Sequence, residues 1–213
     1  MRPKLLDLFC CQGGASAGYI AAGFDVVGVD INPQPRYPFR FIQADALEYL
    51  ADNAQHFDAI HASPPCQAYS LCQRIQGNEH PDLIGPVREL IEQAYKPYII
   101  ENVVEARDEL IDPVLLCGEM FGLRTYRHRL FETDFDLVAP EHPAHPRPTT
   151  KMGRPVRDGE NMHIVGNFAG VDLGREIMEM PWANRDGLRE AIPPAYTEFI
   201  GAQLLEQLGE RAA

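Results

Sequence analysis

A rigidly held cysteine is the first residue in this sequence whose setting suggests chemistry. Cys66 directly follows Pro64 and Pro65 and precedes Gln67. Proline fixes φ and removes a backbone donor, so the chain is stiff at this point. A thiol attacks only as the thiolate and needs a partner acid to make the attack productive. A buried structural cysteine is the usual alternative, but a core residue gains nothing from stiffness, so the setting favours a nucleophile.

Other polar side chains share the position of this cysteine at the end of an apolar run. Asp30, Asp45 and Glu101 each come just after such a run, as Cys66 does. Ligands bind at the carboxyl edge of the strands in an open α/β sheet. We therefore expect these residues, which are far apart in the sequence, to meet in one crevice.

The elements that must position these residues alternate along the chain. Apolar runs predict strands at 5–9, 24–29, 39–42, 57–61 and 97–100, and helical spacing predicts helices at 15–22, 46–51, 82–94 and 196–208. This alternation is typical of βαβ units and predicts an α/β fold with a parallel sheet covered on both faces. After residue 135 the chain is rich in Pro, His and Gly, which predicts an irregular insertion.

A glycine-containing turn follows the first predicted strand. The spacing of Gly13, Gly14 and Gly18 does not match a pyrophosphate-binding GxGxxG loop. The loop could cradle a smaller anion, such as the carboxylate of an amino-acid-like cofactor, or be a plain strand-to-helix turn. Asp30 could accept both hydroxyls of a ribose, and Asp45 could accept from an exocyclic amine such as that of adenine. Each could equally be a helix cap or a turn acid.

Two arginines precede a short apolar run. If Arg127 and Arg129 lie in one strand, both guanidiniums point to the same face and could donate to a base carbonyl or a phosphate. A surface basic pair is the alternative. A Cys–His protease is another class to weigh, because His61 and His128 are present, but their spacing shows no partner arrangement for a thiol.

Composition bounds the class of protein. With 213 residues and 45% hydrophobic content, we expect one domain with a small appendage. No apolar stretch is long enough to span a bilayer and the N-terminus lacks a signal peptide, so we expect a cytoplasmic protein with no membrane partner. The five cysteines are odd in number and contain no CxxC pair, so we expect reduced thiols and no metal site.

The net charge of −12 points away from a generic nucleic-acid binder. One segment, 142–157, is the exception, because it contains no acid and carries Arg147, Lys151, Arg154 and Arg157. If nucleic acid binds, we expect it near this segment. A solvated basic loop is the alternative.

Five motifs in order resemble the DNA cytosine-C5 methyltransferases. They are Asp7-Leu8-Phe9 with Gly13-Gly14, Ser63-Pro64-Pro65-Cys66-Gln67 with Ser70, Glu101-Asn102-Val103, Arg127-x-Arg129, and Ile192-Pro193-Pro194-Ala195-Tyr196 followed by Ile200-Gly201. The match covers 5–135 and about 187–208. The resemblance implies a Rossmann-like methyltransferase fold with a catalytic core at 1–135, a short recognition-like insertion at 136–186, and a C-terminal helix at 187–213 that packs back on the core.

The resemblance also implies the cofactor S-adenosylmethionine and a role for each matching residue. Cys66 would attack C6 of a cytosine flipped out of double-stranded DNA, Glu101 would act at N3, Arg129 would hold O2, and Arg127 would support the pocket. The residues implied to bind the cofactor are Asp7, Phe9, Cys11, Gln12, Gly13, Gly14, Asp30, Ile31, Asp45, Ala46 and Pro64. Those implied to bind substrate are Pro65, Gln67, Ser70, Asn102, Arg147, Lys151, Arg154 and Arg157.

The chain departs from the family pattern in four places. Cys11 replaces an expected glycine, Asp30 stands where many members have glutamate, and Thr125 stands where the arginine motif usually begins with glutamine. The recognition region is only about fifty residues long. We therefore keep open a pyrimidine-C5 methyltransferase acting on single-stranded DNA, RNA or free nucleotide, the transfer of a modified group, and a catalytically idle nucleic-acid-binding or cofactor-sensing protein. A monomer is expected, with a helper or restriction partner left open.

Overall fold

The computed structural model describes residues 2–66 and 82–211, and a seven-stranded sheet lies at its centre. Its strands are β1 (Lys4–Leu8), β2 (Asp25–Asp30), β3 (Arg40–Gln43), β4 (Ala59–Ala62), β5 (Tyr98–Asn102), β6 (Val114–Leu116) and β7 (Arg129–Thr133). They are ordered β3-β2-β1-β4-β5-β7-β6; β1 to β5 pair in parallel, and β7 runs antiparallel between β5 and β6. The predicted mostly parallel sheet is confirmed.

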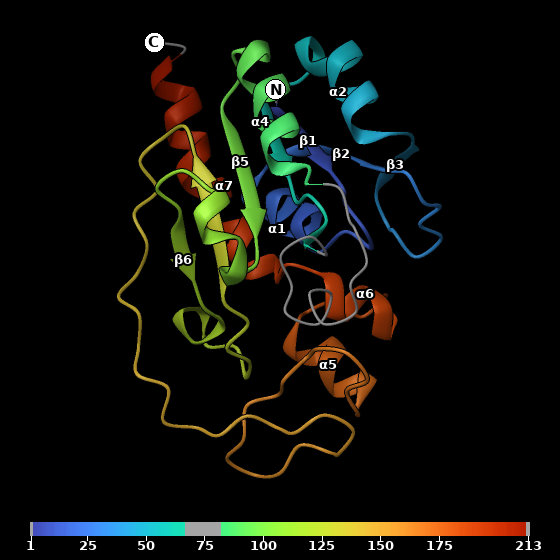
Figure 1. Ribbon diagram of the computed structural model, residues 1–213, viewed down its shortest axis with the longest axis vertical. Helices are drawn as coiled ribbons and strands as arrows, with labels where there is room; N and C mark the ends of the chain where they lie inside the picture. The colour runs from blue at the N-terminus through green and yellow to red at the C-terminus, as the bar shows by residue number, and fades with distance from the viewer. Residues whose placement is uncertain (1, 67–81, 212–213) are drawn as a thin grey trace.

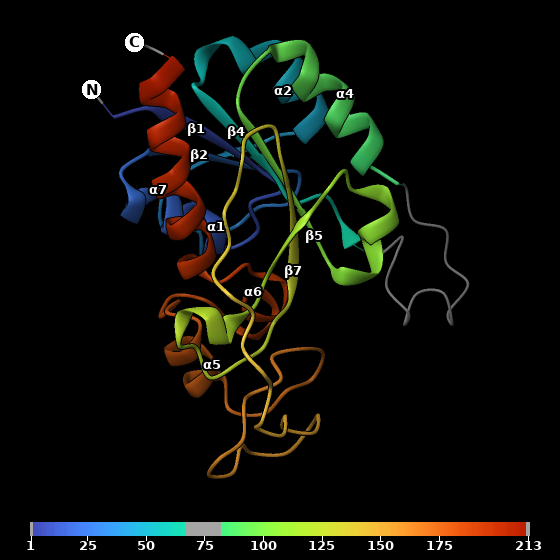
Figure 2. The same cartoon turned by 90° about the vertical axis from the view of Figure 1, so that its left-hand side faces the viewer.

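Helices cover both faces of this sheet. They are α1 (Gly14–Ala22), α2 (Ala46–Asn53), α4 (Ile84–Ala94) and α7 (Pro194–Arg211), with the short 3-10 turns η1 (Ala54–His56), η3 (Val104–Glu109) and η4 (Gly118–Phe121). In Figure 2, α1 and α7 lie on one side of the strands, and α2 and α4 on the other. None of the helices in the described ranges is long and apolar enough to cross a membrane.

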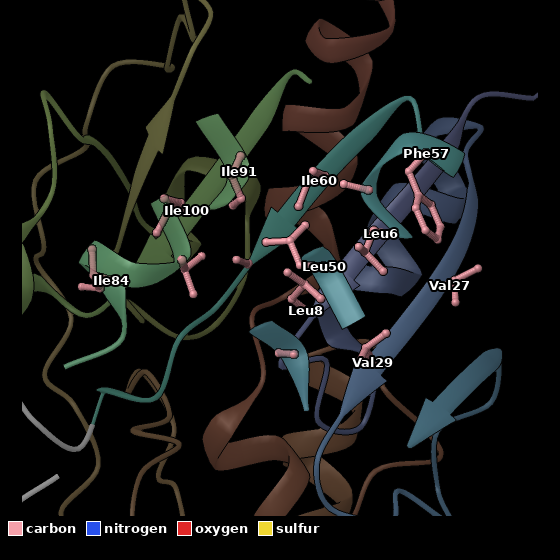
Figure 3. Close-up of a cluster of buried hydrophobic side chains, with 14 of the residues drawn as sticks. Leu6, Leu8, Val27, Val29, Leu50, Phe57, Ile60, Ile84, Ile91 and Ile100 are labelled. Carbon is pink, nitrogen blue, oxygen red and sulfur yellow. The ribbon is translucent and has the colours of Figure 1, made fainter. Parts of the chain in front are cut away.

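Alternation along the strands explains why both faces need a cover. In β1, Leu6 and Leu8 belong to the buried cluster under α2 and α4, while Leu5 belongs to the cluster under α1 and α7. Successive side chains of a strand point to opposite faces, so a strand that is apolar throughout must be buried on both sides. Figure 3 shows the first of these clusters, where Leu50 of α2 packs among Leu8, Ile60 and Val29 of three neighbouring strands.

The closest helix contact joins the two ends of the chain. A Cβ added to Gly14 would collide with the carbonyl of Ile192, and one added to Gly18 would collide with the carbonyl of Pro194. The two glycines therefore let α7 lie directly against α1, as Figure 1 shows. The residues expected to open the loop to a ligand also serve this contact between helices.

The insertion is more ordered than the sequence predicted. It contains α5 (Val171–Ile177) and α6 (Arg185–Glu190), which lie below the sheet in Figure 1. A separate buried cluster holds them together: Met162, Ile164, Phe168, Ile177, Met178, Met180, Ala183, Leu188 and Ala191. Within the predicted insertion, only 136–170 follow the irregular course up to the first helix. Each helix has at most seven residues, too few to show a helical period in the sequence.

Candidate active site

A cavity of about 320 Å³ opens at the carboxyl edge of the parallel strands. Its walls come from the segments that follow β1, β2, β4 and β5, together with the start of β7 and the end of α6. Asp30, Cys66 and Glu101 all line it, so three of the four polar strand-end residues meet as predicted. A volume near the lower end of the range for small-molecule sites suits a ligand that is largely enclosed.

The most concentrated chemistry in this cavity is an ion pair beside a thiol. Arg129 Nε forms an ion pair with Glu101 Oε1 at 2.9 Å, and both side chains are largely buried. Cys66 lines the same cavity and feels both charges, because Arg129 lowers the pKa of its thiol while Glu101 raises it. A nucleophile, an acid and a fixed cation therefore share one cavity.

The backbone around Cys66 is held from two sides. The Asn102 side-chain amide donates to the carbonyl of Pro64 at 2.9 Å, and the Ser63 N–H donates to the carbonyl of Leu8 at 3.2 Å. The first contact fixes the cysteine segment to the end of β5, next to Glu101. The stiffness predicted from the prolines is thus increased by hydrogen bonds across the sheet edge.

Burial sets the protonation of the two reactive groups. Desolvation raises the pKa of the Cys66 thiol, with Arg129 opposing it. Desolvation also raises the pKa of Glu101, although Arg129, Arg127 and a hydrogen bond from Ser63 all favour the carboxylate. A carboxyl group with a raised pKa is better able to hold a proton when the site needs one.

Asp7 forms part of the floor of the cavity and is buried. Its Oδ2 accepts from Ser16 Oγ, whereas its Oδ1 has no hydrogen-bond partner among the described residues. Desolvation raises the pKa of Asp7 to about 7. An unpaired buried carboxylate oxygen is costly, so this atom points to a missing donor in the cavity.

The first loop is strained and turns its backbone toward the cavity. Phe9 and Cys11 have positive φ of 59° and 46°, which non-glycine residues rarely adopt, and both line the cavity with Gly14. The Cys11 N–H donates to Asp30 Oδ2 at 3.1 Å. The Asn32 N–H donates to Asp30 Oδ1 at 2.9 Å, so the Asp30 carboxylate is held at the end of β2 with lone pairs to spare.

Two residues expected to bind the cofactor occupy the start of α2 instead. Asp45 Oδ1 accepts from the N–H groups of Leu47 and Glu48, which makes Asp45 the N-cap of the helix. Ala46 is buried as its first residue. Among the described residues, neither lines the cavity. The observed contacts of Asp45 are those of a helix cap, which was the alternative to a role in adenine binding.

Gln12 and Gly13 also serve other parts of the fold. The Gln12 side-chain amide donates to Asn184 Oδ1 at 2.9 Å, and the Gln12 backbone carbonyl accepts from Trp182 Nε1 at 2.7 Å. Gln12 therefore ties the first loop to the start of α6. Gly13 has φ 82° as N-cap of α1. Gln12 and Gly13 are not among the residues that line the cavity. Four other residues predicted to bind cofactor or substrate do line it: Ile31, Pro64, Pro65 and Asn102.

Arg127 and Arg129 do not lie in one strand, so the condition under which both guanidiniums would point to the same face is not met. β7 begins at Arg129, while Arg127 lies before it with a φ of 34°. The Arg127 guanidinium is buried and donates to the carbonyls of Ile164, Arg189 and Ala191 at 2.9, 2.7 and 2.8 Å. Arg127 therefore supports the wall of the cavity by holding the insertion against β7, and Arg129 alone of the two lines it.

Besides Pro65 and Asn102, which line the cavity, the predicted substrate-binding residues fall into three groups. Gln67 and Ser70 lie outside the described residues. Arg147, Lys151 and Arg157 are exposed on the insertion. Arg154 instead pairs with Glu160, Nη2 to Oε1, at 2.5 Å.

The end of α6 brings residues to the cavity that the sequence analysis did not select. Arg189, Glu190, Ala191 and Ile192 line it, and desolvation raises the pKa of Glu190. Glu190 is close to Cys11, with Oε2 3.9 Å from Sγ. Ile192 is the first residue of the last motif, and the only signal for the other three was their position just before it, because α6 is too short to be recognised by its period.

The two histidines weighed as protease partners have other contacts. His61 is buried, with Nδ1 2.9 Å from the Tyr19 hydroxyl and Nε2 2.8 Å from Ser63 Oγ. His128 Nε2 lies 3.1 Å from His142 Nε2. His61 is therefore linked through Ser63 to Glu101, whereas His128 lies in a separate cluster of histidines.

Comparison with known proteins finds relatives of one class. No protein-family model matches the chain. The type II methyltransferase M.AgeI of Thalassovita gelatinovora is 25% identical over 181 residues, which are 67% of this chain and 42% of that protein. M.AquIA of Picosynechococcus sp. is 26% identical over 64% of this chain and 68% of that protein. M.XorII of Xanthomonas oryzae pv. oryzae is 26% identical over 93% of this chain and 53% of that protein. The chain thus spans about half the length of these relatives.

Solved structures share the fold over nearly the whole chain. A prophage-encoded E. coli protein described as a DNA modification methyltransferase superposes with a TM-score of 0.70, 15% identity, and 98% and 100% of the two chains covered. The Dnmt2 methyltransferase of S. pombe superposes with a TM-score of 0.60 and 14% identity, and 98% of this chain and 99% of that chain are covered. The fold is that of the S-adenosylmethionine-dependent methyltransferases. In the order of its motifs, in its sequence relatives and in its fold, the chain resembles the DNA cytosine-C5 methyltransferase family.

Proposed function

We propose that this chain transfers a methyl group from S-adenosylmethionine to C5 of cytosine in DNA through a covalent bond between Cys66 and C6. The observation that carries the proposal is the meeting of Cys66 with the Glu101–Arg129 ion pair in one cavity. A thiol next to a buried acid and a fixed cation suits addition to a polarised ring better than it suits binding alone.

The residues present fit the cofactor. The unpaired Asp7 Oδ1 offers an acceptor to a donor such as an ammonium group. The Asp30 carboxylate, held by two backbone N–H groups at the end of β2, offers acceptors to ribose hydroxyls. When bound, S-adenosylmethionine supplies an electrophilic methyl group. Phe9, Cys11 and Ile31 would enclose it along the same wall.

The chain's own residues then prepare the cytosine. Cys66 loses its proton, and its thiolate forms a bond to C6 while the C5–C6 π electrons move into the ring. Glu101 donates a proton or hydrogen bond at N3, and Arg129 donates to O2, so the negative charge that develops on the ring is neutralised. C5 becomes nucleophilic and takes the methyl group, whose bond to the sulfonium sulfur would break to leave a neutral thioether, and C5 then loses its proton to a base. Cys66 then leaves as thiolate and the aromatic ring is restored.

A mechanism-based trap tests this proposal. A duplex containing 5-fluorocytosine has no C5 proton to lose after methyl transfer, so the Cys66–C6 bond should persist. We expect a methylated protein–DNA adduct that maps to Cys66, that requires S-adenosylmethionine, and that Cys66→Ala abolishes. Cys72→Ala, which removes the next thiol in the sequence, is the matched control and should keep the adduct.

The nature of the product separates the competing functions. Digestion of normal substrate to nucleosides should give 5-methylcytosine rather than a base methylated on an exocyclic amine. Duplex DNA, single-stranded DNA, RNA and free nucleotide are compared with labelled cofactor, because the net charge of −12 keeps the smaller substrates in view. Near-normal methyl transfer by Cys66→Ala, or an exocyclic product, would overturn the mechanism.

A further inference from the structure

One cysteine and three histidines converge outside the cavity. The ligand atoms of Cys117, His128, His142 and His145 all lie within 4.8 Å of one another. Cys117 Sγ is 3.2 Å from His145 Nε2, and His128 Nε2 is 3.1 Å from His142 Nε2. We propose that these four residues form a structural zinc site.

The distances suit a tetrahedral ion. Zinc–nitrogen bonds of about 2.0–2.1 Å and zinc–sulfur bonds of about 2.3 Å give ligand–ligand edges of roughly 3.3–3.6 Å in a tetrahedron. The two short distances involve different atom pairs, so they form opposite edges of that tetrahedron. His142 and His145 are exposed, and small rotations of their side chains can bring the remaining edges, now at most 4.8 Å, to the same length.

The donor set selects the kind of ion. A thiolate with three imidazoles suits zinc and other borderline metals, and it excludes calcium and magnesium, which take oxygen ligands. Four protein ligands leave no open position for water or substrate, so the site is structural rather than catalytic. The ion itself would take no part in the methyl-transfer chemistry.

The fold brings the four ligands together from three places. Cys117 directly follows β6 and His128 directly precedes β7, and these strands pair side by side through Leu116 and Arg129. The sheet thus places the first two ligands without help from the insertion. His142 and His145 form an HxxH pair, with two residues between them, in the extended segment after β7.

An ion here would fix the insertion to the strand that carries Arg129. Tyr126 stacks on His145, with ring centroids 3.8 Å apart, and its hydroxyl contacts the backbone N–H and carbonyl of Arg147. On the other side, the carbonyl of His128 accepts from Arg129 Nη1 at 2.8 Å. The ion would therefore order the start of the basic segment and support the cavity wall at Arg129.

The sequence alone predicted no metal site. The ligands follow the pattern C-x10-H-x13-H-x2-H, which contains no CxxC pair. Only the HxxH pair was a local signal, and it lies in a segment rich in proline. The pairing of β6 with β7 is what brings the cysteine and the first histidine to it.

Zinc measurement on the full chain tests the proposal. We expect one zinc ion per chain by native mass spectrometry, and binding weakened by more than about tenfold in His142→Ala/His145→Ala, since even partners that only orient a ligand are worth that much. Both histidines are exposed, so this variant should keep its fold. The matched control is His56→Ala/His163→Ala, which removes two other exposed histidines and should bind zinc normally.

Cobalt identifies the cysteine. Co(II) in the wild-type chain should show tetrahedral d–d bands and a thiolate charge-transfer band, and Cys117→Ser should lose the charge-transfer band. Chelator should lower the Tm of the wild-type chain and leave that of the double variant unchanged. Zinc binding equal in the wild-type chain and the double variant, or a cobalt spectrum without thiolate, would show that the four residues form only a hydrogen-bonded cluster.

Discussion

Arg129 Nε lies 2.9 Å from Glu101 Oε1, so the two side chains form an ion pair. Among the described residues that line the cavity, Arg129 is the only cation from β7 and Glu101 is the only acid from β5. The pair is nearly buried, and it acts on the neighbouring thiol with opposite signs. Arg129 lowers the pKa of Cys66 and Glu101 raises it. Burial raises the pKa of the nucleophile most, and these two side chains from two strands then move it in opposite directions.

This balance predicts opposite shifts in two variants. Arg129→Met removes the cation, so the pKa of Cys66 should rise further. Glu101→Gln removes the negative charge, so the pKa of Cys66 should fall. The measurement is the rate of iodoacetamide alkylation of Cys66 against pH, followed by peptide mass spectrometry, because only the thiolate reacts.

The comparison has an internal reference. Arg189→Met removes another cation from the cavity lining, but Arg189 is not among the groups that shift the pKa of Cys66. Its alkylation profile should follow that of the wild-type chain. Profiles unchanged from the wild-type chain in both the Arg129 and the Glu101 variants would mean that burial alone controls the thiol.

The sequence predicted the parts of the site that strands position. Asp30, Cys66 and Glu101 follow buried strands, and parallel pairing carries strand ends to one edge whatever lies between them. Asp45 follows a strand too, but the helix after it begins at once and uses its carboxylate as a cap. The same residue type at the same position thus has two uses, and the distance to the next helix decides between them.

Contacts made across the fold were not legible in the sequence. The three carbonyls that hold Arg127 come from residues 37 to 64 positions away, and none of them has a side-chain signature. Likewise α6 contributes Glu190 to the cavity only because its segment packs on a separate core. Backbone acceptors and short helices are set by tertiary packing, so local patterns do not predict them.

Asp7 should make stability depend on pH. Burial raises its pKa from its ordinary 3.8 to about 7, so the folded chain holds this proton more tightly than the unfolded chain. The stabilising contribution is therefore complete below about pH 4 and is lost as pH rises to about 7, by up to about 4 kcal/mol. Urea unfolding across this range should show the slope in the wild-type chain, and Asp7→Asn should flatten it.

The control for this prediction is an exposed acid on a neighbouring strand. Asp25→Asn, at the exposed start of β2, should keep the wild-type slope. An unchanged slope in Asp7→Asn would assign the pH dependence to the other acids of the cavity whose pKa is raised by desolvation, Glu101 and Glu190.

The exposed basic residues of the insertion should control the salt dependence of DNA binding. Each phosphate contact that is lost reduces the slope of log K against log salt by about 0.9. Arg147→Ala/Lys151→Ala should therefore reduce it by up to about 1.8. Arg154→Gln/Glu160→Gln removes a cation and an anion already paired with each other, so it should leave the slope near the wild-type value. Equal slopes in the two double variants would place the DNA on another surface.

Two helical glycines should respond to alanine in opposite directions. Gly18 of α1 faces the carbonyl of Pro194, so the added Cβ would force α7 away from α1. We expect Gly18→Ala to lose about 1–3 kcal/mol of unfolding free energy by urea denaturation, as overpacked sites do. Gly85 of α4 has no atom within 4 Å of an added Cβ, and Gly85→Ala should gain up to about 1 kcal/mol, because alanine is the better helix former. A loss in Gly18→Ala no larger than the change in Gly85→Ala would mean that α7 can shift away at little cost, and that the close contact is not needed to hold the two ends of the chain together.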